Sequence, residues 1–466
     1  MNAPIIWIGL PLLLSILLWI PRRANITALL GGISALFFAA LAWFVPIDTA
    51  IRISGNLSLK IASSIEILGR QITITSADQP LLALLYGLSA IWFFGSSAAY
   101  IARRLVPIGM AILALLIASL AVEPFLYAAL IIQTAILIAV PLLSPPEVKP
   151  GRGVIRFLIY QTLAMPSILF SGWLLAGVES SPGDIELLTQ AAVLLALGFA
   201  FLLAIFPLYT WIPLLMEEAS PYATGFILWL LPNVTFLFAL GFLDRYAWLR
   251  EYAQLPNALR IAGILMVVTG GIWAAFQRHL GRMMGYAAII NTGFSLLALS
   301  LLAEHQLSAF FLLQIPQALG LATWSLALSV LKMRENSLSL KRTQGMFQRY
   351  PIIISGLLFA HFSAMGLPLL AGFPPIIAIW EGLAKQNILA AFWVGLGLAS
   401  LFTGALHTLA VVVMSPADLS WEINGSWVQN TLVGMGIFFI LLLGFFPQLL
   451  HPLLVNLPLA FEHIGG

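Results

Sequence analysis

Few residues in this sequence could carry a proton through an apolar environment. His361, Glu381 and His407 are the only Asp, Glu, Lys, Arg or His residues well inside its long apolar stretches. A proton relay through hydrocarbon needs such groups, because they gain and lose a proton. Side-chain amides order water but do not titrate near neutral pH. The proton-path candidates are these three residues and three amides, namely Gln133, Asn291, Gln317, His361, Glu381 and His407.

Each candidate also has an ordinary structural interpretation. Glu381 and Lys385 are four residues apart, a spacing that pairs opposite charges on one helix face near a membrane interface. His361 fits a neutral imidazole that bonds to a backbone carbonyl freed at a helix break, and His407 fits a weaker version of the same role. The amides, together with Gln314, fit hydrogen bonds between helices.

Nothing in this sequence supports redox chemistry within the chain itself. Cysteine is absent, which excludes disulfides, cysteine-ligated zinc and cysteine-held iron–sulfur clusters. The sequence has no nucleotide-binding glycine motif and no Walker loop, and its histidines lack close metal-ligand spacing. We therefore expect no catalytic centre, no metal site and no cofactor in this chain.

The composition describes a protein whose main solvent is lipid. Of its 466 residues, 61% are hydrophobic and only 8% are charged, whereas soluble proteins carry about 25% charged residues. The net charge of +3 does not indicate nucleic-acid binding, because the basic residues lie in short loops. We predict an all-α integral membrane protein whose partner is the lipid bilayer and not a nucleic acid.

About fourteen apolar stretches are long enough to be membrane helices, since about 20 apolar residues cross a bilayer. The stretch at 351–384 is too long for one plain crossing and predicts an internal break. The predicted spans are 5–20, 27–45, 80–99, 105–122, 124–143, 157–177, 188–206, 222–243, 261–276, 285–303, 307–331, 351–384, 387–414 and 428–446.

Loop charges predict the orientation of these helices. Loops after odd-numbered helices hold twice as many Lys and Arg residues as loops after even-numbered ones. The positive-inside rule then places the odd loops in the cytoplasm and both termini on the outer side. We predict a multi-pass protein of a bacterial inner or plasma membrane.

One stretch, 51–77, alternates apolar and polar residues and predicts a small β-hairpin on the outer surface, with an irregular loop as the alternative.

Proline-rich motifs interrupt two predicted helices, the seventh at 206–213 and the twelfth at 366–375. Proline removes an amide donor, and open backbone at membrane depth is tolerated only inside protein or beside a wet cavity. Paired broken helices indicate an inverted-repeat transporter, whereas ordinary proline kinks are the alternative. The motif residues are Pro207, Trp211, Pro213, Gly366, Pro368, Gly372 and Pro374.

The spacing of the breaks predicts two five-helix inverted repeats, helices 4–8 and 9–13, with helices 7 and 12 broken. The domains follow as 1–104 with helices 1–3 and the hairpin, 105–243 as the first repeat, 261–414 as the second repeat, and 415–466 with the last helix.

Three stretches carry a resemblance to a known family. Residues 206–221 read FPLYTWIPLLMEEASP, residues 281–293 read GRMMGYAAIINTG, and residues 366–373 read GLPLLAGF. They resemble motifs of the antiporter-like membrane subunits of respiratory complex I, a family shared with Mrp-type cation/proton antiporters and membrane-bound hydrogenases. Helix number, external termini and break positions are similar along nearly the whole chain.

The sequence departs from this family at its proton-path positions. The resemblance implies a glutamate in the fifth helix and lysines in the seventh, eighth and twelfth helices. Tyr209 and Asn291 stand where the family has histidines. By this alignment the glutamate and lysine positions hold Gln133, Leu202, Asn233 or Val234, and Ile376.

The resemblance implies an antiporter-like subunit of an NADH:quinone oxidoreductase-like, proton-translocating assembly, with other membrane subunits as partners and any redox cofactor bound by them. Two alternatives are a non-conducting structural subunit of such a complex and an independent cation/proton transporter.

Overall fold

The computed structural model describes residues 2–464 apart from 55–56, 68, 145–148, 181–184, 303–306 and 415–423. Within these residues, ten helices are long and apolar enough to cross a membrane, and four shorter apolar helices accompany them. Together they match the predicted fourteen segments. The predicted start of the C-terminal segment at 415 lies outside the described residues.

The N-terminal half contains the first eight membrane segments. After a short π-helical turn, its helices are α1 (Leu10–Leu17), α2 (Ala24–Phe44), α3 (Gln79–Gly95), α4 (Ala102–Ala121), α5 (Ala128–Leu143), α6 (Arg152–Ser180), α7 (Ile185–Leu202), α8 (Trp211–Glu218) and α9 (Pro221–Arg245). The seventh segment is divided into α7 and α8, as the sequence predicted.

The C-terminal half contains the remaining six segments. Its helices are α10 (Ala247–Arg250), α11 (Leu255–Ala275), α12 (Leu280–Ser300), α13 (Leu307–Glu335), α14 (Pro351–Ala364), α15 (Phe373–Gln386), α16 (Ile388–Val413), α17 (Trp427–Phe445) and α18 (His451–Asn456). The long stretch at 351–384 is divided into α14 and α15, which confirms the predicted internal break.

The alternating stretch forms strands, but it makes two hairpins where the sequence predicted one. Strands β1 (Ala50–Ser54) and β2 (Leu57–Lys60) pair antiparallel, and so do β3 (Ser64–Ile67) and β4 (Arg70–Thr73). The short strand β5 (Val122–Glu123), which directly follows α4, extends the second hairpin to three strands. Local alternation of apolar and polar residues carries no information about pairing with a distant segment, so the sequence did not predict this three-stranded sheet.

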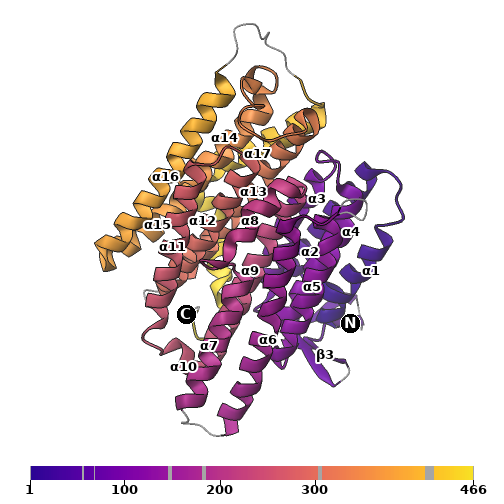
Figure 1. Cartoon of the computed structure of the whole chain (residues 1–466). Coiled ribbons are helices and arrows are strands. Elements are labelled where there is room, and N and C mark those ends of the chain that lie inside the picture. Colours follow the sequence, from indigo (N-terminus) through magenta and orange to yellow (C-terminus); the bar gives the residue numbers. More distant parts are fainter. Residues whose placement is uncertain are drawn as a thin grey trace.

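The two halves of the chain lie side by side, and both chain ends lie in the lower half of the view with β3 and α10 (Figure 1). The halves meet where α8 and α9 pack against α12 and α13. In the 18-residue apolar stretch of α9, 83% is buried inside the protein, whereas only 22% of the corresponding stretch of α17 is buried. Helix α9 therefore lies inside the protein, at the seam between the two halves, whereas α17 lies mostly at the surface.

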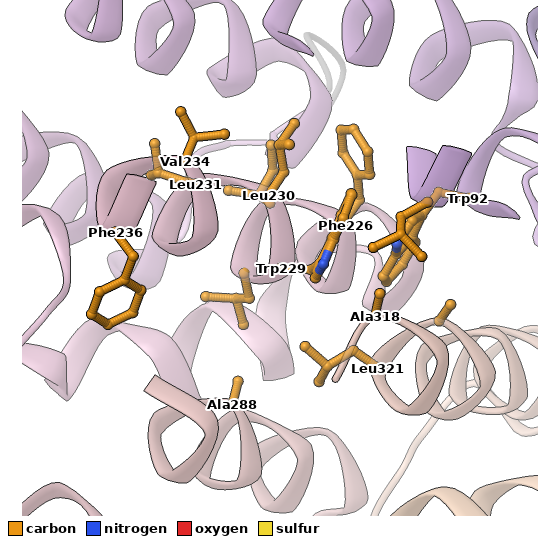
Figure 2. Packing of buried hydrophobic residues seen from close by; sticks show 14 of the residues in the cluster. Trp92, Phe226, Trp229, Leu230, Leu231, Val234, Phe236, Ala288, Ala318 and Leu321 are labelled. Carbon is orange, nitrogen blue, oxygen red and sulfur yellow. The ribbon is translucent and has the colours of Figure 1, made fainter. Parts of the chain in front are cut away.

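Aromatic side chains fill this seam. Trp92 of α3 stacks on Trp229 of α9 with ring centroids 6.2 Å apart, and Phe226 lies edge-on to Trp92 at 5.8 Å. Figure 2 shows these rings beside Leu321 of α13 and Ala288 of α12. Phe236 of α9 lies edge-on to Phe310 of α13 with ring centroids 5.7 Å apart, which is an aromatic contact between the two halves.

Candidate functional site

The first broken helix ends well before its prolines. Helix α7 stops at Leu202, and Ala204 takes the left-handed conformation with φ of 51°. The amide of Ile205 donates to the carbonyl of Ala200 at 2.9 Å, and that of Ala204 donates to Phe201 at 3.2 Å. This pair of bonds is the Schellman motif, which closes a helix C-terminus.

The second broken helix ends in the same way. Gly366 follows α14 with φ of 71°. The amide of Leu367 donates to the carbonyl of Phe362 at 3.2 Å, and that of Gly366 donates to Ser363 at 3.0 Å. The breaks therefore share a backbone geometry, although they lie five membrane segments apart.

Different partners complete the hydrogen bonds at each break. At the first break the side-chain amide of Gln161, from α6, donates to the carbonyls of Phe201 at 3.4 Å and Leu202 at 3.2 Å. At the second break the hydroxyl of Ser363 accepts from the amide of Gly372 at 3.1 Å. The bonds to Leu202 and from Gly372 pair backbone groups at membrane depth, whereas the carbonyl of Phe201 also accepts from the amide of Ala204.

Three small cavities lie between the breaks. The first, about 10 Å³, is lined by Leu202 and Ala204 at the first break and by Gln161. The second, also about 10 Å³, is lined by Asn233 of α9. The third, about 20 Å³, is lined by Ser363, Gly372 and Ile376 at the second break.

The cavities adjoin one another through shared walls. Thr292 lines the first and second cavities, and Asn291 and Gln317 line the second and third. Each volume is close to the space that a single buried water needs. None of their lining residues is Asp, Glu, Lys, Arg or His, so the row offers hydrogen bonds but no charge.

A tryptophan lines each cavity: Trp211 the first, Trp229 the second and Trp324 the third. Their indole N–H groups have no hydrogen-bond partner among the described residues, and neither does the side-chain oxygen of Gln161. Buried indole donors normally have a partner. Unpaired donors beside cavities of this size are suited to bind water, so the row fits a short file of single waters.

The predicted amides divide between this row and its surroundings. Asn291 and Gln317 lie in the row, where the side-chain amide of Gln317 donates to the backbone carbonyl of Asn291 at 3.2 Å. Gln133 lies apart from it and donates to the hydroxyl of Thr162 at 2.9 Å, which links α5 to α6. That bond agrees with the interhelical interpretation of Gln133.

His361 lies beside the row. Within the part of the chain that the structure describes, it is the only His, Asp, Glu, Lys or Arg that is buried. Its ring lies against Trp324, with centroids 4.4 Å apart. Neither ring nitrogen has a partner among the described residues. The expected bond to a freed carbonyl is therefore wrong, and the ring instead packs against the indole with the two ring planes tilted by 31°.

Glu381 and His407 lie on the outer surface of the chain. Glu381 and Lys385 form an ion pair of 3.0 Å with both side chains largely exposed, which confirms their predicted pairing. His407 is exposed on α16. The structure therefore does not bring these two candidates together with the central cavities.

Three of the positions aligned with the family's charged residues line the cavities, whereas Gln133, at the glutamate position, lies apart from them. Leu202 lines the first cavity, Asn233 the second and Ile376 the third. Sequence reasoning missed Gln161, because it selected Gln133 through alignment with the family's glutamate and applied no such criterion to Gln161. It also missed the tryptophans, which have no signal that separates them from ordinary core residues.

An ionic cluster closes one end of the seam. The guanidinium of Arg282, in α12, donates to Glu217 of α8 at 2.7 Å and approaches it at 2.5 Å through a second nitrogen. Burial lowers the pKa of the neighbouring His279, the Glu217 carboxylate raises it, and the cations of Arg282 and Lys332 lower it further. The cluster ties the first broken helix to the second half.

The profile of a known family matches more than half of the chain. Its description is NADH:quinone oxidoreductase/Mrp antiporter, TM, and the match covers residues 157–403. Among curated proteins, NADH-quinone oxidoreductase subunit 14 of Thermus thermophilus is 26% identical over 338 residues, which cover 68% of this chain and 73% of that protein.

The NAD(P)H-quinone oxidoreductase chain 4-3 of a Nostoc species is 24% identical over 304 residues, which cover 59% of this chain and 52% of the relative. The alignment therefore spans about half the length of that protein.

Solved structures share the fold along the whole chain. A chain of respiratory complex I from Thermus thermophilus matches with a TM-score of 0.77 and 19% identity, over 99% of this chain and 100% of the other. A chain of an archaeal membrane-bound sulfane sulfur reductase matches with a TM-score of 0.79 and 15% identity, over 100% and 98%. A chain of the Mrp complex from a Dietzia species matches at 0.76 and 13%, over 99% and 97%.

Proposed function

We propose, from the premise that this chain belongs to the NADH:quinone oxidoreductase/Mrp antiporter membrane family, that it serves as an antiporter-like subunit inside a multi-subunit membrane complex. The relatives and solved structures that support this role are themselves chains of such complexes. In this proposal the redox reaction belongs to other subunits, and both termini face the outer side of a bacterial inner or plasma membrane.

The observation that carries the proposal is the retained pair of broken helices. Both breaks keep the same cap, at Ala204 and at Gly366, and both open onto the row of cavities. Maintaining two such breaks at membrane depth requires dedicated partners such as Gln161 and Ser363.

The uncharged row supports a subunit that assembles without conducting protons through its own centre. A relay needs groups that titrate, whereas the walls of the three cavities hold amides, hydroxyls and indoles. Gln133 offers an amide where the family has a glutamate. Water and amides alone leave no site at which a proton rests between transfers.

Affinity purification from the native membrane tests the assembly. The tagged full-length chain, extracted in mild detergent, should elute with other membrane subunits in a particle much heavier than the chain itself. A matched variant, Gly271→Leu, should lose this particle, because a Cβ at Gly271 would meet the carbonyl oxygen of Gly397 at 2.0 Å and separate α11 from α16. If the native chain elutes alone, the subunit role is wrong.

One observation favours a second function, proton conduction through His361. Both of its ring nitrogens are buried without a partner in the part of the chain that the structure describes, beside the tryptophan that lines the third cavity. An imidazole has an unperturbed pKa near neutrality and can exchange protons with water at either nitrogen. Conduction by this route would place the proton on His361 between two water-filled segments.

Proton flux separates the two functions. The purified parent complex is placed in liposomes, and flux is compared between the native form and the His361→Ala, Glu381→Gln and double variants. Unchanged flux with intact assembly agrees with a non-conducting centre. A collapse of flux in His361→Ala alone, with Glu381→Gln as the exposed control, would instead establish conduction through the imidazole.

A further inference from the structure

A cavity apart from the three small ones lies between the start of α3 and the end of α9. Its volume is about 390 Å³, which is within the range of binding sites for small molecules. Leu85 of α3, Ile117 of α4 and Phe238 of α9 line it, and strands β4 and β5 add Thr73 and Val122. These ends of α3 and α9 lie on the side that the loop charges predict to be external, so the cavity belongs to the outer end of the protein.

Residues 457–464, here called the strap, form another wall of this cavity. Ala460, Phe461 and Glu462 line it. Leu457 and Phe461 are 0% and 6% exposed, whereas the intervening Leu459 is 59% exposed. The strap is thus a surface segment that turns two apolar side chains into the protein and covers part of the cavity.

The carboxylate of Asp244, in the last turn of α9, holds the backbone of the strap. One carboxylate oxygen accepts the amide of His463 at 2.7 Å, and the other accepts the amide of Glu462 at 3.2 Å. Hydrogen bonds to an ionised acceptor are stronger than those between neutral groups. The imidazole of His463 lies 3.7 Å from the same carboxylate but is 56% exposed, so the backbone bonds fix the strap and the imidazole adds little.

The position of Asp244 does not suit helix α9 itself. A carboxylate near a helix C-terminus lies at the negative end of the helix dipole, which disfavours it. The carbonyls of this helix end have another partner, because the guanidinium of Arg250 donates to the carbonyls of Leu243 at 2.9 Å and of Asp244. The side chain of Asp244 therefore stabilises the strap and not the helix that carries it.

The strap joins the two halves of the chain. Asp244 belongs to α9 in the N-terminal half, whereas the ring of Phe461 stacks on Phe311 of α13 in the C-terminal half, with ring centroids 6.4 Å apart. A segment tied down by contacts of this kind opens while the packed helices stay folded, because local opening needs far less free energy than global unfolding. Both contacts must break for the strap to leave the cavity.

We propose that the strap is a lid that controls access from the outer solution to this cavity, and that Asp244 is its latch. In the closed position Phe461 and Glu462 cover the cavity. When the carboxylate releases the two amides, the lid opens, and water-soluble solutes reach the carboxyl of Asp78 and the hydroxyl of Ser119 on the cavity wall. This inference does not rest on the proposed function, because access to the cavity is independent of assembly and of proton conduction.

Thiol labelling of the full-length chain in nanodiscs, which leave both membrane faces accessible, tests the lid. The sequence contains no cysteine, so one introduced thiol reports one position. Ser119 lines the cavity and is 1% exposed, and Ser119→Cys nearly preserves its size. The rate of modification by a charged, water-soluble methanethiosulfonate is followed by mass spectrometry.

Release of either anchor should accelerate labelling of Ser119→Cys. Asp244→Asn should raise the rate about tenfold, because the loss of one hydrogen bond to a charged group changes the open population by about that factor. Phe461→Ala, which removes the ring stack, should raise it by a similar factor. Asp48→Asn is the matched control and should leave the rate unchanged, since the Asp48 carboxylate also accepts a backbone amide, that of Ser63 at 3.3 Å, but does not hold the strap.

Three outcomes overturn the proposal when the variants elute as the native chain does. An unchanged rate in Asp244→Asn removes the latch, and Phe461→Ala decides in the same way if Asp244→Asn does not fold. Equal acceleration at Ser171→Cys, a buried position of α6 that does not line the cavity, indicates general loosening. Labelling of Ser119→Cys as fast as that of the exposed Leu459→Cys, with Asp244 intact, means that the strap closes nothing. Acceleration confined to Ser119→Cys supports the lid.

Discussion

The two broken helices have the same backbone cap but differ in the residue that adopts its left-handed position. The first break uses Ala204, with φ of 51°, and the second uses Gly366, with φ of 71°. A glycine takes this conformation without cost, whereas an alanine is strained there. The first break is therefore held against its local preference, while the second agrees with it.

The surroundings explain how the first break persists. Gln161 reaches across from α6 to the carbonyls of Phe201 and Leu202, so a neighbouring helix supplies the missing donor. The second break has a local partner, because Ser363 accepts from Gly372, and one tertiary partner, because the amide of Ala371 donates to the carbonyl of Ile440 in α17 at 2.9 Å. The first break thus receives a side-chain donor from a neighbouring helix, whereas the second combines a local hydroxyl acceptor with a backbone acceptor of α17.

Among substitutions at the two breaks, Gly372→Ala should lower the free energy of unfolding the most. A Cβ at this position would lie 1.9 Å from the carbonyl oxygen of Ser363, so the backbone of the second break must move. We expect a loss of about 3 kcal/mol in the free energy of unfolding in detergent. The control is Gly434→Ala in α17, where a Cβ meets nothing within 4 Å. Equal stability of the two variants would contradict the close approach.

Gly366→Ala should cost less, about 2 kcal/mol in the same measurement, because it combines left-handed strain with a modest overlap. The added Cβ would lie 2.9 Å from a methyl carbon of Ile376, which belongs to a flexible side chain. If the variant is as stable as the native chain, alanine is accepted at both breaks and the contrast with Ala204 disappears.

The positions of the breaks were predictable because proline and glycine interrupt regular helices. Pro207 and Pro374 marked the interruptions, and the length of the stretch at 351–384 required one. The apolar runs predicted the number of segments for the same reason, since bilayer thickness fixes their length. The pairing of Glu381 with Lys385 followed from helix geometry alone and is confirmed at 3.0 Å.

The details inside the breaks were not predictable from local sequence. The first helix ends at Leu202, before Phe206 where the motif begins, and an alanine carries no signal for the left-handed conformation. The contact of Gln161 with Leu202 joins residues 41 positions apart. The packing of His361 on Trp324 likewise depends on how α13 meets α14, which periodicity does not reveal.

Gln161→Leu tests whether tertiary contacts hold the first break. The variant leaves two buried carbonyls without their side-chain donor, and one such loss costs about 1 to 2 kcal/mol. We expect a loss of that size in detergent unfolding. Gln190→Leu on the exposed surface of α7 is the matched control and should change little. If both substitutions are equally mild, the break does not depend on α6.

Ala204→Gly should produce the smallest effect, and in the opposite direction. Glycine relieves the left-handed strain but loses a buried methyl contact, since Ala204 is only 2% exposed, and it also makes the unfolded chain more flexible. The net gain should be about 0.5 kcal/mol, visible as a higher thermal midpoint. A lower midpoint would mean that packing of the Ala204 methyl group contributes more to stability than the left-handed strain costs. Alanine would then be the more stable residue at the first break because of its packing contacts.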